Sequence, residues 1–508
     1  MRKVKIRLLW AGFCLLLALQ FAGCVSSEKF YGEVEASRQS AYRRWKNGRD
    51  NQKQTEAVIS GAVTMQDCLK LALTNNKTLQ RIVQEKEFAR GERLKSYSAI
   101  LPSVAVSADY LRKDKVASIG IPGGGLTITM GDVDNYSAAL VVTQPLFAGG
   151  SIPARINAAR LFSLLADETV RSAVENLIFE ASRGYYDVLL NQHLYEISAD
   201  AVRLAQANLD NANQKRRAGV ASDFDVLRVE VELSNFQAEL IRNRNAIKVA
   251  KASLLKVMGI SQDSDYTLSD KLVYVPLNVP MEQAVETAYR NRPDLYGSEI
   301  DIKLQQERLK IARSRYWPVI SGFYQTTRSK PDPHNATVID WGKAWNAGIS
   351  ATLPVFDGLA REGEIVQQKA ILKQSQIDLI DAEETALFEL TRALFSIQDA
   401  NEFVESQRLN LVRAQEGLRL AEVGYREGTN TQLETIDAQS ALTTARANYY
   451  QAIYSHVVAK LALQKAMGVL AKYEPVSTGG DLAWPETKDD SRAVPASSSV
   501  KAEQELTK

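Results

Sequence analysis

The stretch "TQPLFAGG" (Thr143–Gly150) returns in altered form further along the chain as "TLPVFDGL" (Thr352–Leu359). Each copy follows a segment in which apolar and polar residues alternate, which is the pattern of a β-strand. Each copy precedes a long segment that is rich in helix-forming residues. The sequence therefore predicts two equivalent joins, at each of which a strand is followed by a long helix.

Each join contains one proline and one glycine with separate structural roles. Proline has no backbone N–H to donate to a strand ladder, so we expect each strand to end there. Glycine tolerates backbone angles that let the chain swivel into the helix. The residues of the two strand–helix joins are Pro145 and Gly149, then Pro354 and Gly358.

The joins belong to a larger unit that the chain contains twice. The segment Met65–Leu79 has a counterpart at Met281–Leu295, and the interval between the two joins also separates Gly219 from Gly428. Each copy begins with a short and a medium helix. We predict a first repeat at 64–259, a linker at 260–280 and a second repeat at 281–470. Strands are expected at about 103–112, 136–145, 318–328 and 344–354, and long helices at about 150–217, 222–258, 358–424 and 431–468.

The N-terminal residues have the pattern of a secretory signal, in which basic residues precede an apolar segment. That segment, Leu8–Leu19, is too short to remain as a membrane-spanning helix. It ends in "FAGC", which resembles the cleavage site of a bacterial lipoprotein and implies that Cys24 carries lipid as the first mature residue. An ordinary signal peptide cleaved nearby is the alternative. We expect a signal peptide at 1–23, a lipid-anchored segment at 24–63 and a disordered tail at 471–508.

Net charge and the chemically reactive residues exclude several classes of function. The formal net charge is only +2, which argues against a protein that binds nucleic acid by neutralising phosphate. The histidines, His193, His334 and His456, are scattered and lack the spacing of a metal site. The sequence contains no nucleophile–base constellation, which disfavours a hydrolase on a helical scaffold. We expect no enzyme activity and no metal or other cofactor.

The predicted strands suit either of two settings. Period-two alternation with one polar face fits a small soluble sheet packed on helices, and it also fits transmembrane barrel strands of ~9–11 residues with one face toward lipid. In lipid, an unpaired strand edge leaves backbone groups unsatisfied, so the four strands of one chain would need strands from further copies. The long helices carry apolar residues at heptad spacing and need partners along their length.

Three features together resemble the TolC-like outer membrane efflux family, in its lipoprotein-bearing members. They are the duplicated unit, the two "P-[LV]-F-x-G" joins and the stretch "GYREGTNTQLETIDAQSALTTARANYYQA" (Gly424–Ala452). The resemblance covers about 64–470. It implies a mostly α-helical chain with membrane β-structure. Four strands per chain would enter a trimeric twelve-stranded β-barrel, which would continue into a twelve-helix α-barrel in the periplasm.

The same resemblance implies a passive, gated outer membrane channel of a tripartite efflux or type I secretion system. The implied location is the bacterial outer membrane, with a lipid anchor and with helices that extend into the periplasm. The implied partners are two further copies of the chain in a homotrimer, a periplasmic adaptor protein, an inner membrane pump of the RND or ABC type, and outer membrane lipid. A periplasmic coiled-coil adaptor or scaffold is the alternative, although an adaptor would normally have one hairpin rather than two equivalent units.

The resemblance also assigns residues to a gate at the periplasmic end. Glu434 and Asp437 match acidic residues that ring the constriction, and they share one helix face because they are three apart. Asp225 matches an aspartate that an arginine clasps in some members, but the matching arginine position is Asn430. We therefore expect closure to rest on other hydrogen bonds, through Tyr425. The turn tips expected to meet the adaptor are Arg217, Gly219, Arg426 and Gly428. Both glycines also suit a left-handed turn.

Overall fold

The computed structural model describes residues 27–51, 61–120, 127–262 and 264–472. These residues belong to two compact units. The first takes its residues from 1–64 and 259–269, and the second from 65–258 and 270–508. Both sequence repeats contribute strands and helices to the second unit, so the compact units do not follow the duplication. Cys24, the expected signal peptide and nearly all of the expected C-terminal tail lie outside the described residues.

The first unit contains one helix and a pair of very short strands. The helix is α2 (Ser27–Asn51), and the strands are β1 (Gly61–Val63) and β6 (Tyr266–Leu268). The two strands pair in parallel, with Gly61 opposite Tyr266. Neither strand is predicted from the sequence, and β6 lies within the expected linker. Three residues are too few to show a period, so only the pairing reveals them.

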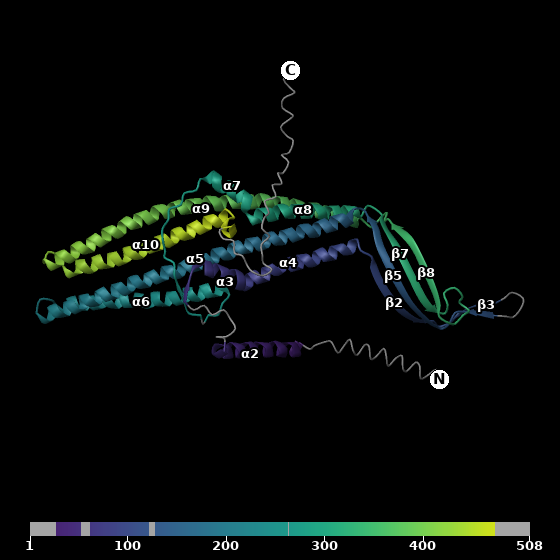
Figure 1. The fold of residues 1–508 in the computed structure, drawn as a ribbon, viewed down its shortest axis with the longest axis horizontal. Coiled ribbons are helices and arrows are strands. Elements are labelled where there is room, and N and C mark those ends of the chain that lie inside the picture. The colour runs from purple at the N-terminus through teal and green to yellow at the C-terminus, as the bar shows by residue number, and fades with distance from the viewer. Residues whose placement is uncertain (1–26, 52–60, 121–126, 263, 473–508) are drawn as a thin grey trace, which may run out of the picture. The chain divides into compact units, whose positions relative to one another are not determined.

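The second unit contains a four-stranded antiparallel sheet that both repeats build. Its strands are β2 (Ser103–Arg112), β5 (Asp134–Ala148), β7 (Val319–Lys330) and β8 (Gly342–Thr352). They lie side by side in the order β2-β5-β7-β8 (Figure 1). The central pair, β5 with β7, joins the two repeats, and β2 and β8 are the edges. A further hairpin, β3 (Ala117–Gly120) with β4 (Thr127–Met130), follows β2 and precedes β5 in the chain, where the sequence predicts no strand.

The first strand–helix join differs from its prediction. β5 continues past Pro145, which pairs with Ser321, so the expectation that this strand ends at the proline is wrong. The ladder shifts its register between Pro145 and Phe147, and such a bulge accommodates a residue that has no N–H to donate. At the second join, β8 ends at Thr352, two residues before Pro354.

Each repeat supplies two shorter helices and two long ones. The first repeat has α3 (Met65–Asn75), α4 (Lys77–Ser96), α5 (Ser151–Arg217) and α6 (Asp223–Met258). The second has α7 (Met281–Asn291), α8 (Pro293–Ser314), α9 (Ala360–Arg426) and α10 (Gln432–Ala466). Helices α5 and α9 contain 67 residues each, which corresponds to about 100 Å. In the described ranges, no helix has an apolar stretch long enough to cross a membrane.

Local sequence explains where several of these helices begin. The Asn76 side chain accepts a hydrogen bond from the Leu79 amide at 2.9 Å and so caps α4. Pro293 occupies the first turn of α8, where its missing N–H has no consequence. Helices α5 and α9 each follow a residue in the left-handed region, Gly150 and Leu359 respectively.

The core of the second unit is a set of seams between long helices. The heptad positions Leu390, Ile397 and Val404 of α9 are at most 3% exposed. Leu390 and Ile397 pack in one cluster with Ala459 and Leu463 of α10. This burial holds α9 and α10 together as a hairpin, as heptad spacing predicts. The two repeats are also bonded directly, because Asn208 of α5 donates to Gln439 of α10 at 2.7 Å.

Candidate functional site

The tips of the two long hairpins have the same backbone geometry. Gly219 follows α5 with φ of 73°, and Gly428 follows α9 with φ of 77°. The Val220 amide donates to the Lys215 carbonyl at 3.0 Å, and the Thr429 amide donates to the Gly424 carbonyl at 2.8 Å. These are the closing bonds of a helix end that needs a left-handed residue, which explains the glycine in each tip. Arg217 and Arg426, the last residues of the two helices, are exposed.

Asp225 and Glu434 occupy equivalent positions in the two repeats, and each has its carboxylate bonded to the start of a helix. Ser222 donates to Asp225 from its amide at 3.0 Å and from its hydroxyl at 2.7 Å. Thr431 donates its amide to Glu434 at 2.7 Å, and the Glu434 amide donates back to the Thr431 hydroxyl at 3.3 Å. The Asp225 amide likewise donates back to the Ser222 hydroxyl at 3.2 Å, so both pairs have the reciprocal bonds of a capping box.

The electrostatic effect of capping is visible at the first tip. The hydrogen bonds from Ser222 hold the pKa of Asp225 below its ordinary value, so this group stays a carboxylate. Sequence reasoning missed the capping role of both acids. The signal was present as S-x-x-D and T-x-x-E just before each returning helix.

One contact joins the two tips through side chains that differ between the repeats. Nζ of Lys215 lies 3.9 Å from the ring centroid of Tyr425, which is a cation–π distance. Both hairpins also contribute to a small apolar cluster of four buried side chains: Ala212, Val226, Val229 and Ile436. Tyr425 was singled out from the sequence, whereas Lys215 was not, because nothing local marks a lysine whose partner lies on another hairpin.

Asn430 does not clasp Asp225. In the described part of the chain no hydrogen bond joins these two side chains, and Asn430 instead lies over Gly424. A Cβ at Gly424 would stand 2.6 Å from Cγ of Asn430, and the Asn430 amide donates to the Gly424 carbonyl at 3.1 Å. The asparagine therefore closes its own turn rather than bridging to the first hairpin.

Asp437 is the least restrained of the acidic candidates. It is exposed on α10, whereas the preceding Thr435 and Ile436 are buried. Within the described ranges Asp437 forms no hydrogen bond or ion pair, and neither it nor Glu434 is bonded to Asp225. The second tip thus carries two exposed carboxylates, of which Glu434 is fixed by a cap and Asp437 is unpaired.

The two strand–helix joins share backbone angles but not surroundings. Gly149 has φ of 60° and Gly358 has φ of 69°. A Cβ at Gly149 would lie 2.4 Å from the Ser314 carbonyl oxygen and 2.7 Å from Cβ of Trp317. No atom lies within 4 Å of the equivalent position at Gly358. The first join therefore needs glycine for close packing as well as for its backbone angle, and the second only for the angle.

A cluster of charges around two buried side chains, Arg292 and Glu175, links both repeats and was not found from the sequence. Arg292, only 7% exposed, donates to Asp294 at 2.6 Å, to Glu389 at 2.7 Å and to the Ala466 carbonyl at 3.2 Å. Glu175 of α5 is 4% exposed, and its Oε1 has no hydrogen-bond partner. Burial raises the pKa of Glu175 to about 7 despite the opposing charge of Arg171. These residues are far apart in sequence, so no motif marks them.

Comparison with known proteins gives a consistent result. The profile of the family described as "Outer membrane efflux protein" matches residues 68–260 and 284–469. The chain is 23% identical over 415 residues to the toluene efflux pump outer membrane protein TtgC of Pseudomonas putida, covering 80% of this chain and 82% of that protein. It is 20% identical over 453 residues to the outer membrane protein TolC of Escherichia coli, covering 86% and 88%.

A solved structure shares the fold. A membrane protein from Pseudomonas aeruginosa superposes with a TM-score of 0.70 at 20% identity, over 80% of this chain and 90% of that one. Among the described residues, no group of three or more His, Cys, Asp or Glu side chains is arranged to hold a metal ion.

Proposed function

The chain belongs to the outer membrane efflux protein family and is an outer membrane channel component of an efflux system; we propose that three copies assemble into one gated duct. The duct conducts passively from a periplasmic entrance, formed by the hairpin tips, to the exterior. The observation that carries this proposal is an open four-stranded sheet whose strands β5 and β8 lead into helices of 67 residues.

Unpaired sheet edges support assembly from several copies. Strands β2 and β8 have 10 and 11 residues, and each has a neighbour on one side only. In lipid such edges need partners, so β8 of one copy pairs with β2 of the next. Three copies with four strands each give the twelve-stranded barrel that the family resemblance implies.

Apolar side chains left exposed on the long helices support the same assembly. On α9, Ile377, Phe388 and Phe395 are 53%, 66% and 63% exposed. On α6, Phe224 and Val231 are 63% and 55% exposed. In one isolated chain this surface meets water, whereas in a trimer neighbouring helices cover it. Burial of apolar area therefore drives formation of the periplasmic α-barrel.

The tips form the gate in this proposal. Glu434 and Asp437 from three copies place six carboxylates around the entrance, which favours cations. Lys215 and Tyr425 hold the two hairpins of one copy together and oppose their separation. Since Asn430 does not clasp Asp225, the Lys215–Tyr425 contact takes the place that the clasp has in other members.

The exposed tip residues Arg217 and Arg426, with Gly219 and Gly428, are proposed to meet a periplasmic adaptor protein. The adaptor connects the duct to an inner membrane pump, of the RND or ABC type. Cys24 is proposed to carry the lipid that fixes the N-terminal segment to the outer membrane.

Membrane extraction tests this proposal against a periplasmic scaffold. The full chain in the outer membrane should resist high salt and carbonate, dissolve only in detergent, and migrate as an oligomer that heating converts to monomer. In planar bilayers the detergent-purified oligomer should conduct ions. Release by carbonate as a monomer would instead identify a periplasmic scaffold.

A further inference from the structure

One face of the four-stranded sheet is apolar and exposed along most of its length. Because side chains alternate, the strand register assigns each residue to a face. Val106, Trp345 and Ile349 lie on one face, here called the apolar face, and are 77%, 68% and 74% exposed. The opposite face carries mainly small and polar residues: Ser107, Ser137, Thr143, Gln325 and Asn346. In the proposed barrel, the apolar face contacts lipid.

Besides Arg112 of β2, which pairs with Asp134, three basic residues interrupt the apolar face near the end that is remote from the helices. Arg328 of β7 lies directly opposite Lys343 of β8, and Lys330 stands two residues further along β7. Directly opposed side chains have Cβ atoms about 4.5–5.5 Å apart, and like charges at that spacing destabilise a sheet. Such a pair is tolerated where an anion lies between its members.

The protein does not supply that anion within its described residues. Arg328 and Lys343 are exposed and form no ion pair there. The carboxylate at the β5 end of the apolar face, Asp134, already accepts a hydrogen bond from Tyr110 at 2.8 Å and pairs with Arg112. The positive charge of the opposed pair is therefore available to an external ligand.

Aromatic rings on both sides place this pair at the depth of lipid headgroups. Toward the strand ends, Tyr136 lies 5.0 Å from Tyr110 and 6.4 Å from Trp341, measured between ring centroids. In the other direction, Trp345 stacks on Tyr324 at 6.3 Å. Tyrosine and tryptophan gather at membrane–water interfaces, where one end of the ring is wet and the other apolar.

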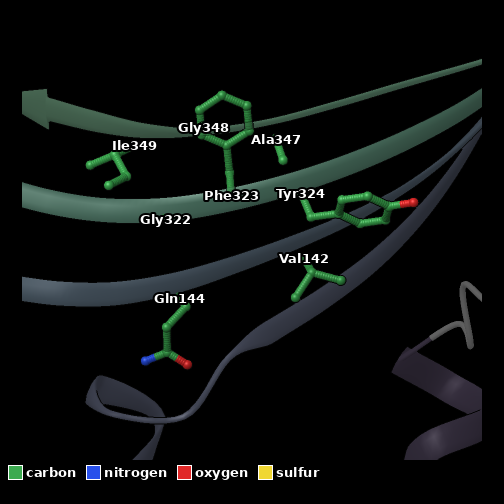
Figure 2. Close-up of a pocket in the computed structure, with 8 residues that line it drawn as sticks. All are labelled: Val142, Gln144, Gly322, Phe323, Tyr324, Ala347, Gly348 and Ile349. Atoms are coloured by element: carbon green, nitrogen blue, oxygen red, sulfur yellow. The ribbon is translucent and has the colours of Figure 1, made fainter.

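An apolar depression lies further into the lipid zone of the same face (Figure 2). It has a volume of about 480 Å³, and most of its lining comes from two cross-strand rows of the apolar face: Val142, Tyr324 and Ala347, then Gln144, Gly322 and Ile349. The remaining lining residues, Phe323 and Gly348, form a pair that the register assigns to the opposite face. Gly322 has no side chain, so the surface is recessed at the centre of the depression. From Arg328 to these rows is four to six residues along β7, or roughly 13–20 Å at ~3.3 Å per residue. Half of a bilayer's hydrocarbon core is ~15 Å thick, so an acyl chain can reach the depression.

We propose that the apolar face binds a phosphorylated lipid of net negative charge, with its phosphate between Arg328 and Lys343 and an acyl chain in the depression below. Lys330 is a third donor at the headgroup. The ligand is a membrane lipid rather than free phosphate, because the basic pair is set in a surface that is otherwise apolar. This inference rests on the proposed placement of the sheet in the outer membrane.

The test uses the full-length chain in nanodiscs of phosphatidylcholine that also contain a bisphosphorylated glycolipid of the lipid A type. Native mass spectrometry then counts the glycolipid retained per oligomer. The wild-type chain should retain the phosphorylated glycolipid over the same lipid stripped of phosphate. Arg328→Gln with Lys343→Gln should lower this retention at least about fivefold, because charge-assisted hydrogen bonds to phosphate are lost.

Lys113→Gln with Lys115→Gln is the matched control, since it removes the same charge from exposed positions just beyond β2. This control should retain the glycolipid as the wild type does. Gly322→Leu, which fills the depression, should also weaken retention. Equal retention of phosphorylated and dephosphorylated lipid by the wild type, or equal losses in the two double variants, would overturn the site.

Two further measurements separate the lipid site from its alternatives. Competition by inorganic phosphate tests for a simple anion site, and entry into nanodiscs tests whether the sheet lies in the membrane. Inorganic phosphate added in excess should not displace the glycolipid. Full displacement would overturn the lipid site and identify a simple anion site. A wild-type chain that does not enter nanodiscs at all would overturn the membrane placement of the sheet, and the lipid site with it. Entry without preference for phosphorylated lipid would overturn the lipid site alone.

Discussion

Lys215 and Tyr425 connect the two helical hairpins of one chain at their tips, with Nζ of the lysine 3.9 Å from the centre of the tyrosine ring. The positions equivalent to them in the other repeat are Gly424 and Arg216, so the duplication does not repeat this contact. The two hairpins have matching backbones and matching caps, yet among the described residues one lysine–tyrosine contact joins them at the tips, without a counterpart from the other repeat. That asymmetry makes the pair the natural place to test how the tip stays closed.

Removal of this contact should open the entrance. Lys215→Gln or Tyr425→Ala removes a cation–π interaction worth about 0.5–1 kcal/mol, which corresponds to about 2–5-fold in the closed-to-open ratio per protomer. Single-channel recording in planar bilayers should show larger conductance or longer open times. Tyr425→Phe is the control, because it retains the ring and should behave as the wild type. A Lys215→Gln channel that conducts as the wild type does would remove this pair from the gate.

Neutralising Glu434 and Asp437 should reduce cation selectivity without unfolding the tip. In Glu434→Gln with Asp437→Asn, glutamine still completes the capping box with Thr431, so only charge is lost. The reversal potential in a salt gradient should move toward zero. The control is Asp381→Asn with Glu384→Gln, two exposed acids of α9 with the same spacing. If both double variants shift the reversal potential equally, the tip acids are not the selectivity ring.

Glu434→Ala should add a structural defect that Glu434→Gln lacks. Alanine removes the bond to the Thr431 amide while the Thr431 hydroxyl still caps the helix, and one net hydrogen bond is worth about 0.5–1.5 kcal/mol. Amide hydrogen exchange in the first turn of α10 should therefore be faster in Glu434→Ala than in Glu434→Gln. Identical exchange in the two variants would contradict the capping role.

The two join glycines should respond differently to alanine. At Gly358, alanine has free space and meets only backbone strain of about 1–2 kcal/mol. At Gly149, the added Cβ would also collide with the Ser314 carbonyl, so we expect Gly149→Ala to lose much more stability than Gly358→Ala does. The temperature at which the oligomer dissociates in detergent measures the stability of each variant. An equal decrease of this temperature in the two variants would show that the first join accommodates the added Cβ without an energetic cost.

Glu175 should make the folded protein less stable as the pH rises. Its folded pKa, about 7, lies above the ordinary 4.5, so the folded state holds a proton that the unfolded state releases. The stabilisation is complete below about pH 4.5 and is lost as the pH rises through about 7, by at most about 3 kcal/mol per chain. Charged neighbours from three helices surround the group: Arg171, Arg292, Asp294 and Lys465.

Glu175→Gln keeps the shape and removes the charge, so its thermal midpoint should exceed that of the wild type at about pH 8 and approach it at about pH 5. Glu180→Gln, an exposed position on the same helix, is the control and should follow the wild type at both pH values. A wild-type midpoint that rises between pH 5 and pH 8 relative to Glu175→Gln would contradict the raised pKa.

Local patterns were sufficient for the order and type of the main elements. The predicted strand at 103–112 and the observed β2 have the same bounds, and the predicted helices at 150–217 and 222–258 differ from α5 and α6 by one residue at their starts. Alternation, heptads and helix-ending glycines are read from neighbours in the chain, so sequence reveals them.

The same sequence alone determined the duplication, because comparing the chain with itself reveals it. It also determined the two strand–helix joins and the tip glycines, because each of these depends on backbone preferences of a few adjacent residues. Only the tertiary structure decided that β5 runs through Pro145 beside β7, that Lys215 meets Tyr425, and that Glu175 is buried near Arg292. It likewise decided that Arg328 stands opposite Lys343. Each of these depends on which distant segments pack together, and that choice is made by burial and strand pairing over the whole chain rather than by any local pattern.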